Sequence, residues 1–274
     1  MISPDAPKTL WAWGKNNAGQ LGLSDAITRS SPVQVGALVN WRSVSVGNFQ
    51  SLATKTDGTL WAWGKNEYGQ LGLGDYVYRS SPVQVGILAT WGAIATSSRQ
   101  SFALKTDGTL WSWGRNTGNG YLGLGDYVHY VGYPWYTNLK LSRSSPVQVG
   151  TLATWSAVSV GGSSFSLALK TDGTLWAWGT SGSEGYLGLG DLIKRSSPTQ
   201  IGTLATWSQI GNGSRHSLAI KTDGTLWAWG HNVYGQHGLA DFAARSSPAQ
   251  VGTLATWTTI AQGNQALHSL GLHV

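Results

Sequence analysis

The 274-residue sequence predicts an all-β fold: a single closed five-bladed β-propeller with four-stranded antiparallel blades, spanning residues 1–274. Three observations predict it. A segment of ten residues, KTDGTLWAWG, recurs along the chain at a spacing of about fifty residues. Each copy contains the turn and one strand of a β-hairpin. Finally, no apolar run shows the 3.6-residue period of a helix.

Five repeats account for most of the chain. The first Trp of each WAW or WSW motif falls at positions 11, 61, 111, 176 and 227, so the spacings are 50, 50, 65 and 51 residues. The RSSP motif also occurs five times. The third repeat is therefore enlarged, and the others are nearly uniform.

The hairpin of each repeat is centred on Asp-Gly, which favours a two-residue type I′ turn. In the second repeat, pairing through Asp57-Gly58 sets Leu52 opposite Trp63 on one face. On the other face it sets Ala53 opposite Ala62. A bulky face packs densely against a small one, so we expect successive blades to stack around a ring with tryptophans between them.

Two further strands complete each blade, one from SPVQVG and one from segments such as WSAVSVG. The chain begins with KTLWAWG, which matches the strand after the Asp-Gly turn. It ends with HSLGLHV, which matches the strand before that turn. We therefore expect the N- and C-terminal strands to pair, closing the ring of a monomer and leaving no free edge strand.

Composition narrows the classes of function. The formal charge is +6, but half of the 18 Lys and Arg residues lie in the repeated RSSP and KTDG motifs. Because nucleic-acid binding needs clustered positive charge, this distribution disfavours a nucleic-acid partner. The absence of Cys excludes disulfides, thiolate metal sites and a cysteine nucleophile.

The sequence also bears on location and source. The first residues, MISPDAPKTLWAWG, lack the basic and apolar segments of a signal peptide, so none is expected. No run of 18 apolar residues occurs, so we expect no membrane insertion and a cytoplasmic or virion-associated protein. Close similarity between the repeats indicates recent duplication, which favours a bacterial or viral source.

The polar residues do not predict an enzyme. Most of the 12 carboxylates stand in Asp-Gly turns or end LGLGD-type segments, where their repetition indicates a structural role. The six histidines show no metal-ligand spacing, and no phosphate-binding glycine motif occurs. We therefore expect no catalytic residue, no metal and no cofactor.

Residues 8–274 resemble the regulator of chromosome condensation repeat family. The resemblance rests on NEYGQLGLGD at 66–75, followed by SPVQVG, SFALKTDG and TLWAWG-type strands. It implies propeller blades of about fifty residues, although the best known members have seven blades. Activities in the family include nucleotide exchange on a small GTPase, ultraviolet perception, ubiquitin-ligase accessory roles and enzyme inhibition. The nearest match to the photoreceptor motif here, GSRHS at 213–217, lacks its Trp.

The repeats differ mainly in two sets of loops, which hairpin geometry places at the end of each blade opposite the Asp-Gly turn. The largest difference is an insertion at residues 128–140 of the third repeat. Aromatic side chains dominate binding hot spots, so this region is the predicted binding site. Its candidate residues, with two arginines from neighbouring loops, are Tyr127, His129, Tyr130, Tyr133, Trp135, Tyr136, Arg99 and Arg215.

These features predict a non-enzymatic binding or scaffold module that recognises a protein or surface partner through its variable loops. The alternative is a glycan-binding, lectin-like propeller, which several similar pockets would favour. An exchange factor or enzyme inhibitor of the same repeat family is a further alternative. The insertion could also be a hairpin packed on its own blade, and the loop differences could reflect neutral drift.

Overall fold

The computed structural model describes residues 8–274 except 117–119, 127–140, 163, 262 and 264. The described residues form β-strands, turns and loops, and they contain no helix long and apolar enough to cross a membrane. All strand pairs are antiparallel where their register is defined. The predicted all-β fold is therefore confirmed.

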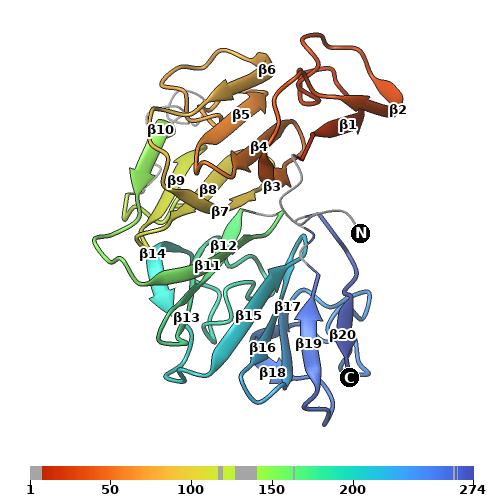
Figure 1. Ribbon diagram of the computed structural model, residues 1–274. Helices are drawn as coiled ribbons and strands as arrows, with labels where there is room; N and C mark the ends of the chain where they lie inside the picture. Colours follow the sequence, from red (N-terminus) through yellow and green to blue (C-terminus); the bar gives the residue numbers. More distant parts are fainter. Residues whose placement is uncertain (1–7, 117–119, 127–140, 163, 262, 264) are drawn as a thin grey trace, which may run out of the picture. The chain divides into compact units, whose positions relative to one another are not determined.

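Four sheets have four strands each, in the same order as the chain (Figure 1). The first two are β3 (Trp41–Val46), β4 (Gln50–Lys55), β5 (Leu60–Gly64) and β6 (Arg79–Gln84), then β7 (Trp91–Thr96), β8 (Gln100–Lys105), β9 (Leu110–Gly114) and β10 (Arg143–Gln148). The others are β11 (Trp155–Val160), β12 (Phe165–Lys170), β13 (Leu175–Gly179) and β14 (Arg195–Gln200), then β15 (Trp207–Asn212), β16 (His216–Lys221), β17 (Leu226–Gly230) and β18 (Arg245–Gln250). These sheets are the predicted four-stranded blades.

The remaining strands form two half-blades. One contains β1 (Trp11–Gly14) and β2 (Arg29–Gln34), and the other contains β19 (Trp257–Ile260) and β20 (Gly271–His273). The predicted pairing of the terminal strands is not among the sheets of the described residues, because β1 pairs with β2 and β20 with β19. A closed ring and a fifth blade thus remain predictions.

The chain divides into two compact units. The first contains residues 1–107, 111–115 and 142–147, and the second contains residues 108–110, 116–141 and 148–274. The half-blade β1–β2 belongs to the first unit, and the half-blade β19–β20 belongs to the second.

The predicted hairpin register is wrong by one residue. Leu52 faces Ala62 and Ala53 faces Trp61, because the turn has three residues rather than two. The amide of Gly58 donates to the carbonyl of Lys55 at 3.0 Å, and Gly58 has a φ of 80°. Asp57 is not in the left-handed region, so the turn is not type I′. A glycine that follows a tight turn in this conformation forms a bulge and adds a residue to the loop.

In the observed register, different residues share each face of the hairpin, but one face still carries larger side chains than the other. Trp61 and Trp63 lie on the face of the small residues Ala53 and Ser51, while Leu52 and Ala62 lie on the other. In the first unit, the Leu and Ala face of blade β3–β6 packs against the tryptophan face of blade β7–β10. In the second unit, blades β11–β14 and β15–β18 pack in the same way. Tryptophans therefore fill the space between blades, as predicted.

Each complete blade also contains a cluster of three tryptophans and one lysine. In blade β7–β10, Trp91 contacts both Trp111 and Trp113 edge to face, at centroid distances of 6.0 and 6.3 Å. Lys105 Nζ lies 3.8 Å from the centre of the Trp111 ring, a favourable cation–π contact. Lys170 makes the same contact and is only 8% exposed. The lysines of KTDG thus pack against tryptophan rings of their own blades.

Candidate functional site

In every complete blade, two variable segments meet at the end opposite the Asp-Gly turn, which we call the loop end. The residue after the third strand of the blade donates its amide to a carbonyl in the loop between the first two. These pairs are Lys65–Phe49, Arg115–Arg99, Thr180–Ser164 and His231–Arg215. The placement predicted for the variable loops is therefore confirmed within each blade.

The Asp-Gly turn occupies the other end of the blade, the turn end, and is held between backbone segments. The carbonyl of Gly58 accepts a hydrogen bond from the amide of Trp91 in the next blade, at 2.9 Å. A Cβ at Gly58 would lie 2.3 Å from the carbonyl oxygen of Ala89. Asp57 caps the turn by accepting from the amide of Thr59 at 2.9 Å. Because the turn is packed against the backbone of the next blade, we assign the repeated Asp-Gly turn a structural role.

The repeated carboxylates at LGLGD also have structural partners. Asp75 pairs with Arg79 at 2.5 Å, and it accepts a hydrogen bond from Asn66 Nδ2 at 3.0 Å. Equivalent ion pairs join Asp25 to Arg29, Asp191 to Arg195 and Asp241 to Arg245. The backbone amide of Ile27 and the Arg29 guanidinium hold the pKa of Asp25 below its ordinary value, against the opposing effect of burial. These aspartates order the loop before RSSP.

Of the eight predicted binding residues, six lie outside the described residues: Tyr127, His129, Tyr130, Tyr133, Trp135 and Tyr136. The other two, Arg99 and Arg215, are exposed at the loop ends of blades β7–β10 and β15–β18. Arg99 belongs to the first compact unit and Arg215 to the second.

Around Arg99, the first unit gathers four basic and two aromatic side chains, which we call the basic loop cluster. It consists of Lys15, Phe49, Lys65, Tyr68, Arg99 and Arg115. Lys15 and Lys65 each lie 5.3 Å from the centre of the Phe49 ring. Arg99 and Arg115 lie 5.5 and 5.2 Å from the centre of the Tyr68 ring.

One carboxylate offsets part of this charge. Lys65 Nζ pairs with Glu67 at 2.8 Å, and that hydrogen bond raises the pKa of Lys65. Because Glu67 neutralises one of four cations, the cluster keeps an excess of positive charge on a partly exposed aromatic surface. An arrangement of this kind suits an acidic surface on a partner.

Arg215 has a different setting in the second unit. It lies in the electrostatic field of Glu184 and Tyr186. Burial and the contact with Glu184 raise the pKa of Tyr186 to about 12, so its hydroxyl stays protonated. This loop end is mixed in charge and does not reproduce the basic loop cluster.

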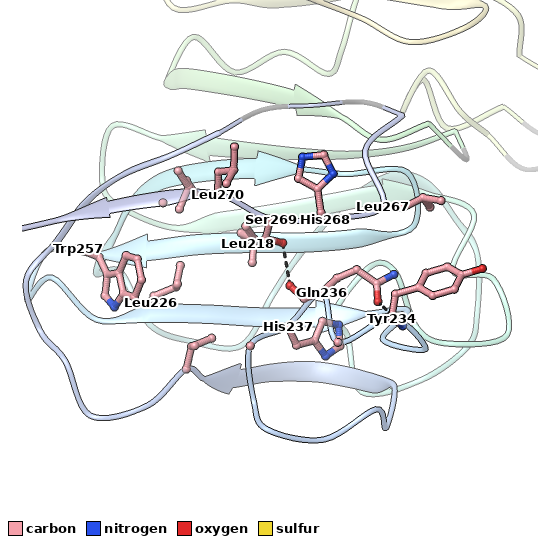
Figure 2. A pocket seen from close by; sticks show the side chains of 15 residues that line it. Leu218, Leu226, Tyr234, Gln236, His237, Trp257, Leu267, His268, Ser269 and Leu270 are labelled. Carbon is pink, nitrogen blue, oxygen red and sulfur yellow. Dashed lines mark hydrogen bonds between the residues drawn. The ribbon is translucent and has the colours of Figure 1, made fainter.

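Two adjoining cavities lie between blade β15–β18 and the half-blade β19–β20, with volumes of about 310 and 180 Å³. Figure 2 shows the larger one, with His237, His268, Ser269 and Trp257 among its lining residues. Both cavities belong to this one interface rather than to equivalent places in successive blades. They therefore do not supply the repeated pockets that would favour a lectin-like function.

Histidines surround these cavities. His216 Nε2 donates to Ser269 Oγ at 3.0 Å, since that hydroxyl already donates to the Gln236 carbonyl at 2.7 Å. Burial lowers the pKa of His216 to about 4 and that of His237 to about 4. The two rings are thus neutral at physiological pH. No group of three His, Asp or Glu side chains among the described residues is placed to hold a metal ion.

Comparison with known proteins identifies the repeat. The model of the regulator of chromosome condensation (RCC1) repeat matches more than half of the chain, at residues 9–54, 57–104, 172–220 and 223–269. The chain belongs to the RCC1 repeat family. A second RCC1 repeat model matches residues 41–70, 155–185 and 207–236. The predicted resemblance is therefore confirmed.

Curated RCC1-type relatives match over short segments. RUG3, a mitochondrial RCC1 domain-containing protein of Arabidopsis thaliana, is 38% identical over 98 residues, which are 35% of this chain and 21% of the relative. Human HERC6, a probable E3 ubiquitin-protein ligase, is 41% identical over 78 residues, 27% of this chain and 8% of the relative. The ultraviolet-B receptor UVR8 of A. thaliana is 38% identical over 72 residues, 26% of this chain and 16% of the relative. This chain thus matches less than a quarter of each of these relatives.

Solved structures of similar fold align with nearly the whole chain. Human WBSCR16 has a TM-score of 0.78 at 23% identity, covering 96% of this chain and 67% of that one. Prp20p from Saccharomyces cerevisiae, whose structure is described with its binding to Gsp1p and histones, has a TM-score of 0.77 at 20% identity. It covers 97% of this chain and 65% of that one. At these identities the likeness shows the β-propeller fold and nothing about partners.

Sequence reasoning about the RCC1 repeats missed the basic loop cluster, although a signal was present. Lys15, Lys65 and Arg115 occupy the same position of successive repeats, directly after the strand WAWG or WSWG. The cavity was missed because it depends on the packing of strands from two sheets. The sequence feature that could have indicated the cavity is the occurrence of three histidines, His216, His237 and His268, in the last part of the chain.

Proposed function

We propose that this chain is a non-enzymatic binding module whose loop ends recognise an acidic surface of a protein partner. The observation that carries the proposal is the basic loop cluster, where four cations from separate segments surround Phe49 and Tyr68. The combination of cationic side chains with partly exposed aromatic rings favours a protein as the partner, because aromatic and Arg side chains are enriched in protein interfaces.

The predicted insertion residues extend this proposal. Tyr127, Tyr130, Tyr133, Trp135 and Tyr136 follow β9, and the loop end of a blade lies after its third strand. We propose that these residues supply aromatic contact area for partner binding, with Arg215 as a further contact. Once a partner is identified, replacing both Trp135 and Tyr136 with Ala should weaken its binding by about 2 kcal/mol or more, while the fold survives.

The two half-blades suggest how the module is completed. The strands β1 and β2 correspond to the third and fourth strands of a blade, and β19 and β20 correspond to the first and second. We propose that together they make a fifth blade, so that residues 1–274 form one closed monomeric propeller. The complementary strand types support this, because a closed ring leaves no exposed edge strand and exposed edges favour aggregation.

A charge-reversal experiment tests the basic loop cluster. The variant Arg99→Glu/Arg115→Glu is compared with Lys8→Glu/Arg42→Glu, which changes net charge equally at exposed residues outside the cluster. Retention of each protein is measured on immobilised poly-L-glutamate and on double-stranded DNA. We expect the cluster variant to lose about tenfold in affinity for polyglutamate, roughly 1.4 kcal/mol, and the control to lose little.

Two results would contradict the proposal. Equal losses in both variants would mean that net charge alone drives retention. Tighter and cluster-dependent binding to DNA would favour a nucleic-acid partner instead. Circular dichroism of each variant establishes that the fold is intact before binding is compared.

A further inference from the structure

A glutamine at the same loop position of three repeats makes the same backbone contact in each. Its Oε1 accepts a hydrogen bond from the amide two residues earlier in the chain. These pairs are Gln20–Ala18 at 2.8 Å, Gln70–Tyr68 at 2.9 Å and Gln236–Tyr234 at 2.9 Å. Because a backbone amide can only donate, the contact fixes which end of each side-chain amide accepts. The Nε2 group of each glutamine is therefore the end that needs an acceptor.

In two of the three loops, the loop itself supplies that acceptor. Gln20 Nε2 donates to Asn17 Oδ1 at 3.4 Å. Gln236 Nε2 donates to His231 Nδ1 at 2.8 Å, so this histidine nitrogen carries no proton. The glutamine is thus satisfied at both ends in these two repeats.

Gln70 has different neighbours. Glu67 stands at the repeat position of Asn17, and Lys65 stands at that of His231. The Glu67 carboxylate pairs with Lys65, and a lysine ammonium group cannot accept a hydrogen bond. Gln70 is 0% exposed, and its Nε2 has no hydrogen-bond partner among the described residues. Because a buried donor without an acceptor is costly, this amide indicates a ligand that brings an acceptor atom.

A second buried donor lies at the same loop end. Arg115 Nε is shielded from solvent and also has no partner in the part of the chain that the structure describes. A Cβ at Gly114, the residue before Arg115, would lie 3.2 Å from the Gln70 Cβ. The Arg115 amide donates to the Arg99 carbonyl at 2.9 Å, and both guanidinium groups contact the Tyr68 ring. Gln70, Arg99 and Arg115 are therefore neighbours within the first compact unit.

The charge of these neighbours indicates the kind of acceptor. Lys65 is paired with Glu67, whereas neither Arg99 nor Arg115 has a carboxylate partner among the residues described. Guanidinium groups bind phosphate and carboxylate oxygens through paired N–H donors. A phosphomonoester carries a charge of about −1.5 to −2 at neutral pH and offers three acceptor oxygens. Its charge therefore matches two arginines more closely than the single charge of a carboxylate does.

We propose that Gln70, Arg99 and Arg115 form an oxyanion subsite of the basic loop cluster, and that its ligand is a phosphorylated side chain of the protein partner. The Gln70 amide and the two guanidinium groups supply one donor group for each terminal oxygen of the phosphate. The partly exposed rings of Phe49 and Tyr68 belong to the same cluster and favour a peptide around the phosphate. The inference rests on the proposed function and names the chemical group that the same surface selects.

Two peptides separate the subsite from general attraction to acidic surfaces. A short glutamate peptide carries either phosphoserine or glutamate at its central position, and its binding to the full chain is measured by fluorescence anisotropy. We expect the phosphoserine peptide to bind about tenfold more tightly. Binding no tighter than that of the glutamate peptide would overturn the subsite, whereas cluster-dependent retention on polyglutamate would still support the proposed function.

The variant Gln70→Met tests the amide itself, and Gln20→Met is its matched control. Both changes remove a glutamine that accepts from a backbone amide in the same kind of loop, but only Gln70 has the donor assigned to the subsite. We expect the Gln70 variant to lose the roughly tenfold preference for phosphoserine and the control to keep it. Equal loss of affinity for the two peptides in Gln70→Met would overturn the role of Gln70.

Gln70→Glu gives a second test that keeps an acceptor for the Tyr68 amide. Its carboxylate repels phosphate and competes for Arg115, so the preference for phosphoserine should again be lost, and a retained preference would contradict the subsite. Thermal unfolding establishes that each variant is folded. Two results would overturn a protein as the source of the phosphate: inorganic phosphate that binds as tightly as the phosphoserine peptide, or Gln70-dependent binding to DNA that is tighter than binding to this peptide.

Discussion

The second tryptophan of each WAW or WSW motif combines several contacts in one side chain. Trp113 is fully buried between blades, contacts Trp91 at its edge and donates its Nε1 to the Gln70 carbonyl. A buried indole needs such an acceptor, since an unpaired polar group in the interior is costly. The count of 16 tryptophans therefore reflects packing that the repeat reproduces.

At the residue scale, Trp63→Ala should lower the free energy of unfolding by roughly 3–5 kcal/mol, because it leaves a cavity between blades. Trp135→Ala, in the insertion, should cost much less. Urea denaturation followed by circular dichroism measures both. Equal losses for the two variants would contradict the structural assignment of Trp63.

His237 replaces a leucine found in the other repeats and makes stability depend on pH. Burial lowers its pKa from 6.5 to about 4, and unfolding restores the ordinary value. The folded state therefore binds fewer protons, so stability rises with pH between about 4 and 6.5 and is lost as the pH falls through this range. The shift corresponds to roughly 3 kcal/mol at most.

We expect His237→Leu to flatten this pH dependence and to stabilise the protein at pH values near the lower end of the window. Leu71 and Leu187 show that the position accepts a buried leucine. Thermal unfolding of both proteins across the pH window provides the measurement. Identical slopes would mean that His237 is not the titrating group.

At the scale of the element, the hairpin formed by the second and third strands of each blade is defined by a three-residue turn with a single left-handed glycine. Its register puts the tryptophans over small residues and leaves the Leu and Ala face for the next blade. A shift of one residue would exchange the two faces, so register and blade packing stabilise each other.

The turn glycine should be the least replaceable residue of the hairpin. Gly58→Ala combines left-handed strain with a clash against the Ala89 carbonyl, at 2.3 Å from the new Cβ. We expect a loss of roughly 2–4 kcal/mol. Gly36→Ala has similar backbone strain, with a φ of 56°, but no atom within 4 Å of the new Cβ, and should cost only about 1 kcal/mol. Equal losses in chemical denaturation would show that the clash is relieved.

At the scale of the whole molecule, the two compact units end in half-blades that have complementary strand types. Neither half-blade has the four strands that every complete blade contains. The proposed fifth blade would combine these strand types in one sheet and leave neither half-blade with an open edge.

Removing residues 266–274 should therefore cause unfolding or aggregation. The deletion removes β20 and uncovers Leu218 and Trp257 on the neighbouring strands. Light scattering and thermal unfolding measure the effect against the full chain. A truncated chain that stays monomeric and equally stable would exclude a closing role for this segment.

The sequence by itself determined the repeat length, the strand segments, the family and the all-β class, because each depends on local patterns that recur every fifty residues or so. It did not determine the hairpin register, since Asp-Gly is compatible with both a two-residue and a three-residue turn. Only the tertiary structure showed how Lys105 packs on Trp111 and how Lys15, Lys65, Arg99 and Arg115 come together. Lys105 meets Trp111 across one hairpin, through the register of that hairpin, whereas Lys15, Lys65 and Arg99 come from separate sheets and are brought together by the stacking of blades.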